Sequence, residues 1–541
     1  MDKCKTYLYR MARRMLEPSA QSKRKALLEN EPVPIPLIRR ILNHFPGLSR
    51  KVKRILKPKQ PAVASPIQYD ERVLDDQRNY QWQNPVEISI LVPLYNTNEK
   101  MLVDMLDSVK AQTYPYWQLC LCDASDNQHT YVAEIVRRYA EQDVRICFQK
   151  RENEGIAQNT NACFAMARAD YIALLDHDDC LAPDALFENA KRIQNEGADF
   201  IYSDEMIFID NPRHVVQYTY KPDFSPETLR SVNYICHLTV FNRMLLQQEQ
   251  LMDSRYEGSQ DHELFLRLTE RALRIVHIPR VLYYWRAHDN SVAGGIAAKP
   301  HCIASGIRAV QSQLNRLSIP AVVTTAKDGY PYYKVQYKIE EKPLISIIIP
   351  NKDHVEDLQT CIRSILAKST YPNYEIIIME NNSTQQETFR FYQQIQQQEK
   401  RITVHVFEGA FNYSQINNQA ARHARGAYLV LLNNDIEICT PDWLEQMLMF
   451  AQRNEVGAVG AKLHYPDGSI QHGGIIVGFG GVAGHAFKDE LQDAPGYLSL
   501  LWVAHNVSAV TAAVSYTHLD VYKRQLYLFC KKRTINPQKA Y

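Results

Sequence analysis

The sequence has no long apolar run. No stretch of its 541 residues approaches the roughly 18 apolar residues of a membrane-spanning helix. The first residues carry charges where a secretory signal would have its apolar core. We therefore expect neither a transmembrane helix nor a signal peptide. Paired cysteines are missing too: the 11 cysteines are scattered without a Cys-X-X-Cys unit. This favours free thiols in a reducing compartment over a disulfide or metal framework.

Extremes of composition are also absent. Hydrophobic residues make up 45% of the chain and charged residues 23%, with 20 Gly and 26 Pro. These values are typical of globular proteins and exclude a wholly disordered, a collagen-like or a disulfide-scaffold chain. At about 150 residues per domain, the length predicts three or four structural units rather than a single core.

Charge, by contrast, is unevenly distributed. Residues 1–60 contain 16 Lys and Arg against four Asp and Glu, whereas the rest of the chain contains 46 basic and 56 acidic residues. Three interpretations of this arm stay open: contact with an anionic membrane surface, nucleic-acid binding, or a solvated helical extension. Nothing else in the chain indicates a nucleic-acid partner. Residues 58–85 are rich in Pro, Gln and Asp, and are typical of a linker or a loosely packed extension.

An internal repeat dominates the rest of the sequence. Glu87–Pro93 (EISILVP) is matched by Leu344–Pro350 (LISIIIP) at an offset of 257 residues. The same offset relates Tyr114-Pro115 to Tyr371-Pro372, and the string YIALLDHD to YLVLLNND. Chance does not hold one offset over so long a stretch, and the period far exceeds that of a solenoid. The chain therefore contains two copies of one domain.

Each copy alternates strands and helices. A β-branched run, Ile88–Val92 or Ile345–Ile349, is typical of a buried parallel strand. Apolar residues at helical spacing follow, and then further apolar strands. This alternation predicts an α/β domain with a mainly parallel sheet. Several strands end at acidic residues, which would converge on the edge where open α/β sheets bind ligands.

Three carboxylates, Asp176, Asp178 and Asp179, follow a strand that is too apolar to be exposed. Their mutual repulsion and their cost of desolvation would be relieved by a hard divalent cation, which takes oxygen ligands. The alternative is the start of a helix near Pro183, whose dipole the acids would complement. Asp123, at the end of a neighbouring strand, adds another acceptor to the same rim and favours the metal.

In these features the chain resembles the family 2 inverting glycosyltransferases with the GT-A fold, in a bacterial tandem-domain form. The resemblance runs from Glu87 to Ala513 and rests on the order, spacing and duplication of its motifs. In the first copy these are ISILVPLYN, QTYPYWQLCLCDASD, RENEGIAQNTN, YIALLDHDD, GSQDHELFLRL and YYWRAHDNS. In the second they are LISIIIPNKD, STYPNYEIIIMENNST, FNYSQINNQAARHARGAYLVLLNNDIEI and VGAVGAKLHYPDGSIQHGGII.

The resemblance implies roles for a small set of residues in the first copy. Pro93, Tyr95 and Asp123 would line the nucleoside pocket, with Asp123 accepting a hydrogen bond from the base. Asp176 and Asp178 would be a DxD pair that holds Mg²⁺ or Mn²⁺ against the diphosphate of a sugar nucleotide. The cation would neutralise charge on the departing diphosphate.

Two further residues take roles from the resemblance. Asp261 would be the general base that removes the acceptor hydroxyl proton, and His288 would complete the metal shell. Attack opposite the leaving group needs one base and inverts the anomeric centre. Without the resemblance, Asp261 is a first-turn acid whose pKa a helix N-terminus would lower, and His288 is an ordinary exposed side chain. Asp204 and Glu205 either face the acceptor or begin a loop.

The second copy departs from the first at the same rim. It has Asn433-Asn434-Asp435 in place of Asp-His-Asp, and Glu380 in place of Asp123. The resemblance still implies metal and nucleotide-sugar binding by Asp435, and nucleotide-sugar binding by Glu380.

The repeat pattern breaks after Ala513. Residues 514–525 (VSYTHLDVYKRQ) resemble translated sequencing-adapter read-through, and we expect no strand or helix that continues the domain there. The second copy would then lack its counterparts of the base and the last metal ligand. The predicted organisation is a basic helical extension and linker, a first GT-A domain with a closing helix, an incomplete second GT-A domain, and a non-native tail. Their respective boundaries are 1–85, 86–340, 341–513 and 514–541.

The leading hypothesis is a metal-dependent, inverting hexosyltransferase. It would move a sugar from a UDP- or dTDP-sugar to a glycan or lipid-linked glycan in cell-surface polysaccharide synthesis, of O-antigen, capsule or rhamnan-like type. It would be cytoplasmic, with residues 1–60 as a peripheral contact on the cytoplasmic face of the inner membrane.

Three alternatives stay open. The first is a sugar-nucleotide-binding or scaffolding protein without turnover, at least for the second copy. The second is a nucleotidyltransferase, against which the glycine-free string PLYNTNEK counts. The third is a glycosidase, for which no pair of flanking carboxylates stands out.

Overall fold

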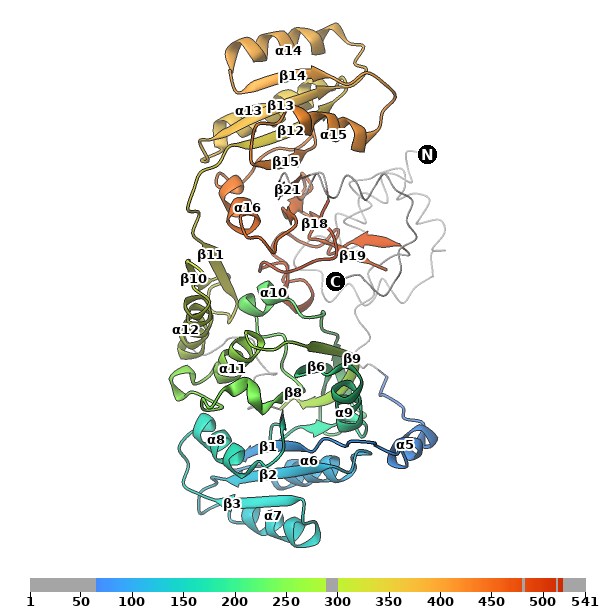
Figure 1. Cartoon of the computed structure of the whole chain (residues 1–541), viewed down its shortest axis with the longest axis vertical. Helices are drawn as coiled ribbons and strands as arrows, with labels where there is room; N and C mark the ends of the chain where they lie inside the picture. The colour runs from blue at the N-terminus through green and yellow to red at the C-terminus, as the bar shows by residue number, and fades with distance from the viewer. Residues whose placement is uncertain (1–64, 289–299, 479–481, 512–513, 519–541) are drawn as a thin grey trace, which may run out of the picture. The chain divides into compact units, whose positions relative to one another are not determined.

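The computed structural model describes residues 65–288, 300–478, 482–511 and 514–518. In these residues each copy of the repeat forms an α/β unit, and Figure 1 follows the two along the chain. The predicted class, α/β with a mainly parallel sheet, is confirmed. The basic arm, residues 1–60, lies outside the described residues. The membrane and nucleic-acid interpretations of this arm therefore stay predictions.

The first copy is built on nine strands, with helices between them. Its strands are β1 (Ile88–Leu94), β2 (Trp117–Asp123), β3 (Ile146–Lys150), β4 (Tyr171–Leu174), β5 (Cys180–Leu181), β6 (Phe200–Phe208), β7 (Val215–Thr219), β8 (Thr239–Asn242) and β9 (Ile275–Arg286). Its helices are α5 (Glu71–Arg78), α6 (Glu99–Lys110), α7 (Tyr131–Gln142), α8 (Ile156–Met166), α9 (Ala185–Glu196), α10 (Pro226–Ser231), α11 (Gln260–Thr269) and α12 (Pro300–Arg316), with 3₁₀ turns η1 (Arg243–Leu246) and η2 (Ser254–Tyr256). The strand order is β3-β2-β1-β4-β8-β6-β9-β5, and β7 pairs with β6.

Strand β1 is central because it buries side chains on both faces. Ile90 and Val92 pack with Leu106 of α6 in one cluster, whereas Leu91 packs with Cys163 of α8 in another. Successive side chains of a strand point to opposite faces, so the apolar run of β1 requires helices on both sides, as parallel sheets do. The arrangement anchors the two neighbouring parallel strands, β2 and β4, whose ends carry the predicted acids.

Residues 71–82, in the segment predicted as a linker or a loosely packed extension, contact the first copy through a few side chains. Helix α5 begins at Asp70, whose side chain accepts a hydrogen bond from the backbone N–H of Arg72. Leu74 is buried, and the Trp82 ring meets Tyr114 edge-on at 4.9 Å between centroids. The polar composition of the segment concealed these apolar contacts, which hold it in place.

The closing helix expected for the first copy is α12, which packs on α11. A hairpin of β10 (Ala321–Thr325) and β11 (Tyr333–Tyr337) follows it. Gly306 of α12 allows Tyr333 to approach closely, because a Cβ at Gly306 would lie 1.7 Å from the Tyr333 hydroxyl oxygen. A side chain there would push the hairpin from the helix.

The second copy repeats the core of the first. Its strands are β12 (Ile345–Asn351), β13 (Tyr374–Glu380), β14 (Ile402–Val406), β15 (Tyr428–Leu432), β16 (Val459–Gly460), β17 (Leu463–His464), β18 (Ile470–His472), β19 (Ile475–Val477), β20 (Ala483–His485) and β21 (Val514–His518). Its helices are α13 (Val355–Lys368), α14 (Gln386–Gln398), α15 (Tyr413–His423) and α16 (Trp443–Ala451), with a 3₁₀ turn η4 (Tyr497–Ser499). The main sheet has the order β14-β13-β12-β15-β21-β16.

Strand β21 overturns the expectation that no strand follows Ala513. Its backbone pairs antiparallel with β15 and with β16, as β8 pairs antiparallel with β4 in the first copy. The residues Val-Ser-Tyr-Thr-His favour a strand through their β-branched and aromatic members, and β15 offers an edge for them to pair with. Residues 519–541 lie outside the described residues, and the non-native origin of the tail stays a prediction.

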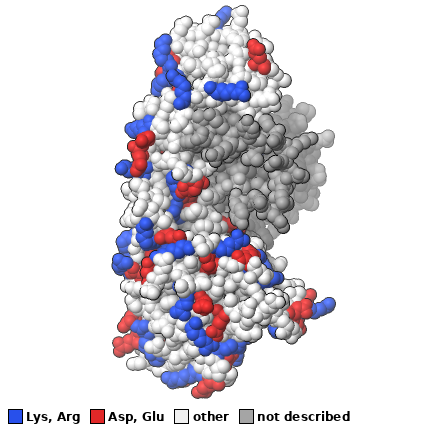
Figure 2. All heavy atoms as spheres, in the orientation of Figure 1, with Lys and Arg blue, Asp and Glu red and all other residues white. Residues whose placement is uncertain are grey.

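The nine cysteines in the described residues are free. Within those residues no helix is both long and apolar enough to cross a membrane. On the face shown in Figure 2, Lys and Arg side chains intermingle with Asp and Glu rather than separating by sign.

Candidate active site

The carboxyl ends of β2, β1 and β4 form one rim of the first sheet. β1 pairs in parallel with both neighbours, so that Leu94 lies opposite Asp123, and Leu91 opposite Leu174. Asp123 is the last residue of β2, and Asp176 follows β4 closely. The rim therefore brings the predicted nucleoside and diphosphate residues to the same edge of the sheet, where ligands bind in open α/β folds.

Asp123 is a buried acceptor at this rim. One carboxylate oxygen accepts a hydrogen bond of 2.8 Å from the backbone N–H of Ser125, and the other lies 3.0 Å from Nζ of Lys150. Pro93 is half-buried in β1, and the Tyr95 ring after it is 46% exposed. The fixed carboxylate of Asp123 and the exposed ring of Tyr95, just after the adjoining strand, suit recognition of a base. The motifs did not identify Lys150.

The three acids after β4 differ in their surroundings. Asp179 is buried, and its oxygens accept hydrogen bonds from the Tyr283 hydroxyl at 2.6 Å and from the Arg286 backbone N–H at 2.7 Å. Burial, together with the nearby charges of Asp176 and Asp178, raises the pKa of Asp179 well above its usual value. Asp179 thus fixes the loop, while the Asp176 side chain is half exposed.

Asp178 pairs with His288 across the loop that follows β4. Asp178 Oδ2 and His288 Nε2 lie 2.8 Å apart. Among the described residues no group of three or more His, Cys, Asp and Glu is gathered as a metal centre. Mg²⁺, however, is usually held by one or two carboxylates together with substrate phosphates and water, so the donor set of Asp176, Asp178 and His288 fits a cation shared with a diphosphate.

Asp261 is the second residue of α11, and its pKa is raised. Burial raises its pKa to about 6, the charge of Asp176 adds to this, and the charge of His237 opposes it. Gln260 Nε2 donates to Asp261 Oδ2 at 3.2 Å. The lowering expected from the helix N-terminus is therefore outweighed by burial. A carboxylate poised near neutral pH is suited to proton abstraction.

A buried charge cluster that the motifs did not identify supports the rim. Lys221 is buried, its Nζ lies 3.4 Å from Glu205 Oε2, and it donates to the backbone oxygen of Ile235 at 3.0 Å. Burial opposes the ionisation of Glu205, yet the charge of Lys221 and hydrogen bonds from His237 hold the pKa of Glu205 below its usual value. Glu205 therefore anchors the cluster.

His237 joins this cluster to the acids. Its ring stacks on Tyr283 with centroids 4.6 Å apart, its Nδ1 lies 3.4 Å from Glu205 Oε2, and its Nε2 lies 3.7 Å from Asp176 Oδ2. Burial alone would lower its pKa, but Glu205 and the charge of Asp176 raise the pKa of His237 to about 9. A positive group therefore stands beside Asp176.

Asp204, the other acid considered for the acceptor, has a structural position instead. It accepts hydrogen bonds from the backbone N–H of Lys221 at 2.8 Å and from Nε2 of His277 at 2.9 Å. Both partners are buried with it. Asp204 thus ties β6 to the turn after β7 and to β9.

The rim of the second copy is more fully bonded within itself. Glu380 accepts hydrogen bonds from the backbone N–H and hydroxyl of Ser383, each at 2.6 Å, and from the Tyr392 hydroxyl at 2.7 Å. Asn434 Nδ2 donates to Asn351 Oδ1 at 2.7 Å, and Asp435 is exposed. Glu380 therefore has less free hydrogen-bond acceptor capacity than the role predicted for its counterpart in the first copy, Asp123, would need.

Parallel strands that carry acids at their carboxyl edge define an α/β enzyme architecture that binds nucleotides at that edge. The chain belongs to glycosyl transferase family 2: the model of that family matches residues 89–252 and 346–481, one stretch in each copy.

Two relatives cover most of the chain. An uncharacterized protein of Sinorhizobium fredii, y4gI, is 40% identical over 80% of this chain and 48% of its own length. The O-antigen biosynthesis protein RfbC of Myxococcus xanthus is 39% identical over 74% of this chain and 31% of its own length. The chain thus spans half or less of these relatives.

Two further similarities are more remote. The hyaluronan synthase of Pasteurella multocida is 23% identical over 68% of this chain and 34% of its own length. The structure of TarS from S. aureus in complex with UDP-GlcNAc is 18% identical, covers 42% of this chain and 67% of that one, and superposes with a TM-score of 0.35. That degree of structural similarity is too low to support conclusions about the site.

Proposed function

We propose that the first copy transfers a sugar from a nucleotide-diphosphate donor to a hydroxyl group of a glycan, with inversion of the anomeric centre. The observation that supports it most directly is Asp261, a partly buried residue whose pKa is raised to about 6. The charge of Asp176 contributes to this raised pKa, which supports a single site for the proposed base and the proposed metal ligands.

The reaction assigns a task to each group. Asp123 and Tyr95 hold the nucleoside, and Asp261 takes the proton of the acceptor hydroxyl as its oxygen attacks the anomeric carbon. One displacement on the face opposite the diphosphate inverts that carbon. Asp176, Asp178 and His288 would hold Mg²⁺ or Mn²⁺, which supplies neutralisation of the leaving diphosphate when bound. His237 places a further positive charge beside Asp176.

The biological setting follows from the relatives. The names of RfbC and of the hyaluronan synthase support an acceptor in a cell-surface polysaccharide, free or linked to lipid. A UDP- or dTDP-sugar is the proposed donor, and the cytoplasmic side of the membrane the proposed location. The exposed Asp435 and the internally bonded Glu380 favour a binding or scaffolding role for the second copy.

The test is release of nucleoside diphosphate by the full chain. We expect release from one of a panel of UDP- and dTDP-sugars only when Mn²⁺ and a glycan acceptor are present, and the opposite anomeric configuration in the product by NMR coupling constants. Donor binding by a folded chain without release at any acceptor would contradict the proposal and favour the scaffolding alternative.

The rate of transfer should depend on pH through Asp261. The base acts when deprotonated, and its pKa is raised to about 6, so kcat/KM should fall by about tenfold per pH unit below that value. A cation that neutralises Asp176 should move the inflection to lower pH, because the charge of Asp176 helps to raise the pKa. Profiles in Mg²⁺ and Mn²⁺ measure this, and a rate independent of pH in this range would argue against Asp261.

A further inference from the structure

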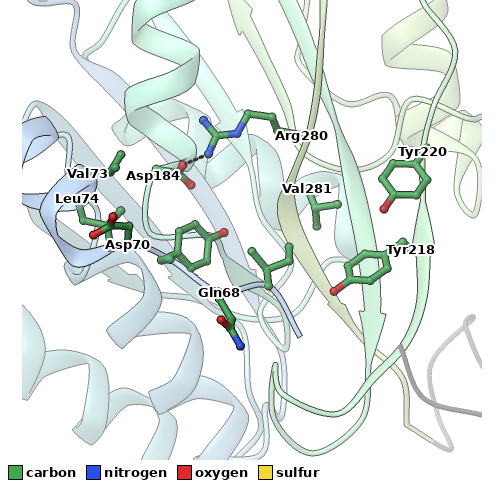
Figure 3. Close-up of a pocket in the computed structure, with 11 residues that line it drawn as sticks. Gln68, Asp70, Val73, Leu74, Asp184, Tyr218, Tyr220, Arg280 and Val281 are labelled. Carbon is green, nitrogen blue, oxygen red and sulfur yellow. Dashed lines mark hydrogen bonds and ion pairs between the residues drawn. The ribbon is translucent and has the colours of Figure 1, made fainter. Parts of the chain in front are cut away.

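A pocket of about 440 Å³ lies between α5, β7 and β9 of the first copy (Figure 3). None of Asp123, Asp176, Asp178 and Asp261 is among the residues that line it. Tyr69, which lines the pocket, is hydrogen-bonded through its hydroxyl to that of Tyr284 of β9 at 2.6 Å. The volume of the pocket lies within the range of ligand pockets, about 300–1,000 Å³.

One wall of the pocket is aromatic. Tyr218 and Tyr220 stack with centroids 6.1 Å apart and an angle of 25° between the rings. Tyr220 is 58% exposed, so its ring presents a flat apolar face to solvent. Figure 3 shows both rings beside Val281. An aromatic ring held next to a cavity offers apolar area at little cost in side-chain entropy.

The other end of the pocket is polar, and one of its atoms lacks a partner. Arg280 donates to Asp184 Oδ2 at 2.5 Å, and Figure 3 shows this pair across the pocket from the two tyrosines. Asp184 is 1% exposed, yet its Oδ1 has no hydrogen-bond partner. A buried acceptor without a donor is rare in folded proteins. A ligand that donates a hydroxyl hydrogen here would satisfy it.

We propose that this pocket binds a neutral sugar unit of a glycan. A pyranose has an apolar C–H face, which suits Tyr218 and Tyr220, and hydroxyl groups, which suit Asp184 Oδ1 and the guanidinium of Arg280. An anionic ligand fits poorly, since Asp184 and Asp70 outnumber Arg280 among the charged lining residues. The site goes beyond the proposed transfer reaction and would retain a glycan chain apart from the rim where the reaction occurs.

The test is glycan binding by the full chain without any donor, so it does not depend on transfer. The probe is a panel of neutral trisaccharides of glucose, mannose, galactose or rhamnose, followed by saturation-transfer NMR and titration. We expect one of these to bind. Tyr220→Ala should weaken it by about tenfold, equivalent to ~1.4 kcal/mol. Tyr220→Phe, which keeps the ring, and Tyr116→Ala, which removes another half-exposed ring, should retain it.

Asp184→Asn provides a second variant, and Asp261→Asn a control at the rim. The first should weaken trisaccharide binding while the chain stays folded by circular dichroism, and the second should leave it unchanged. The proposal is overturned if no trisaccharide binds the folded chain, or if binding is lost in Asp261→Asn but kept in Tyr220→Ala. Binding of UDP or inorganic phosphate that depends on Tyr220 would equally refute a neutral-sugar site.

Discussion

Replacing Asp261 with Asn is expected to lower kcat for sugar transfer by about 10²–10⁴-fold, the usual contribution of a general base. Asn keeps the size and the hydrogen-bonding edge of the side chain but cannot take a proton from the acceptor hydroxyl. Donor binding should change by no more than about twofold, because the base acts on the acceptor rather than on the nucleotide. Steady-state kinetics and calorimetric titration of the donor separate the two effects.

A matched control is Asp253→Asn. Asp253 lies eight positions upstream, where it pairs with the exposed Arg255 at 2.5 Å, and its replacement should leave kcat unchanged. A fall in kcat that is equal in both variants would indicate a structural effect on α11. An unchanged rate in Asp261→Asn would remove the base from the proposed mechanism.

The second large effect is expected for Asp178→Ala in the binding of UDP or dTDP. If Asp178 and His288 hold the cation, the Mn²⁺-dependent part of nucleotide affinity should disappear. We expect nucleotide affinity in Mn²⁺ to fall by about 10²–10³-fold, because the cation contributes several kcal/mol to the binding of the diphosphate. Calorimetry with and without Mn²⁺ measures it, and the better of the two nucleotides identifies the donor class.

The control for this experiment comes from the second copy. Asp435→Ala removes the carboxylate that matches Asp178 at the repeat offset. If the first copy binds the donor, this variant should retain most of the affinity. Loss in Asp435→Ala with none in Asp178→Ala would move the donor site to the second copy and contradict the proposed assignment.

Much of the fold was predictable because its signals are local. The β-branched runs of β1 and β12 could only be buried strands, and a constant offset of 257 residues linked them to the strands that follow. Where local composition and tertiary packing disagreed, the sequence misled. Residues 71–82 look polar, yet Leu74 and Trp82 are held by the first copy. Strand β21 likewise depends on the free edge of β15, which no sequence window reveals.

The candidate site was predictable where motifs follow strands, and not elsewhere. Asp178 and His288 are 110 residues apart but meet at 2.8 Å, and the motifs singled out both residues. Lys221 and His237 belong to no recognisable spacing, and they reach the rim only because β7 and β8 both pair with β6. Their charges depend on burial beside Glu205, which is a property of the packed structure.

The two sheets share one register. Leu94 lies opposite Asp123 and Asn351 opposite Glu380, each pair at the same step along its strands. Ile88 of β1 likewise lies opposite Tyr171 of β4, and the equivalent residues of the second copy, Ile345 of β12 and Tyr428 of β15, also lie opposite each other. The rim residues therefore occupy equivalent positions on one scaffold, and each copy surrounds them with its own partners. Divergence between the copies is thus confined to side chains at the sheet edge and leaves the pairing of the strands unchanged.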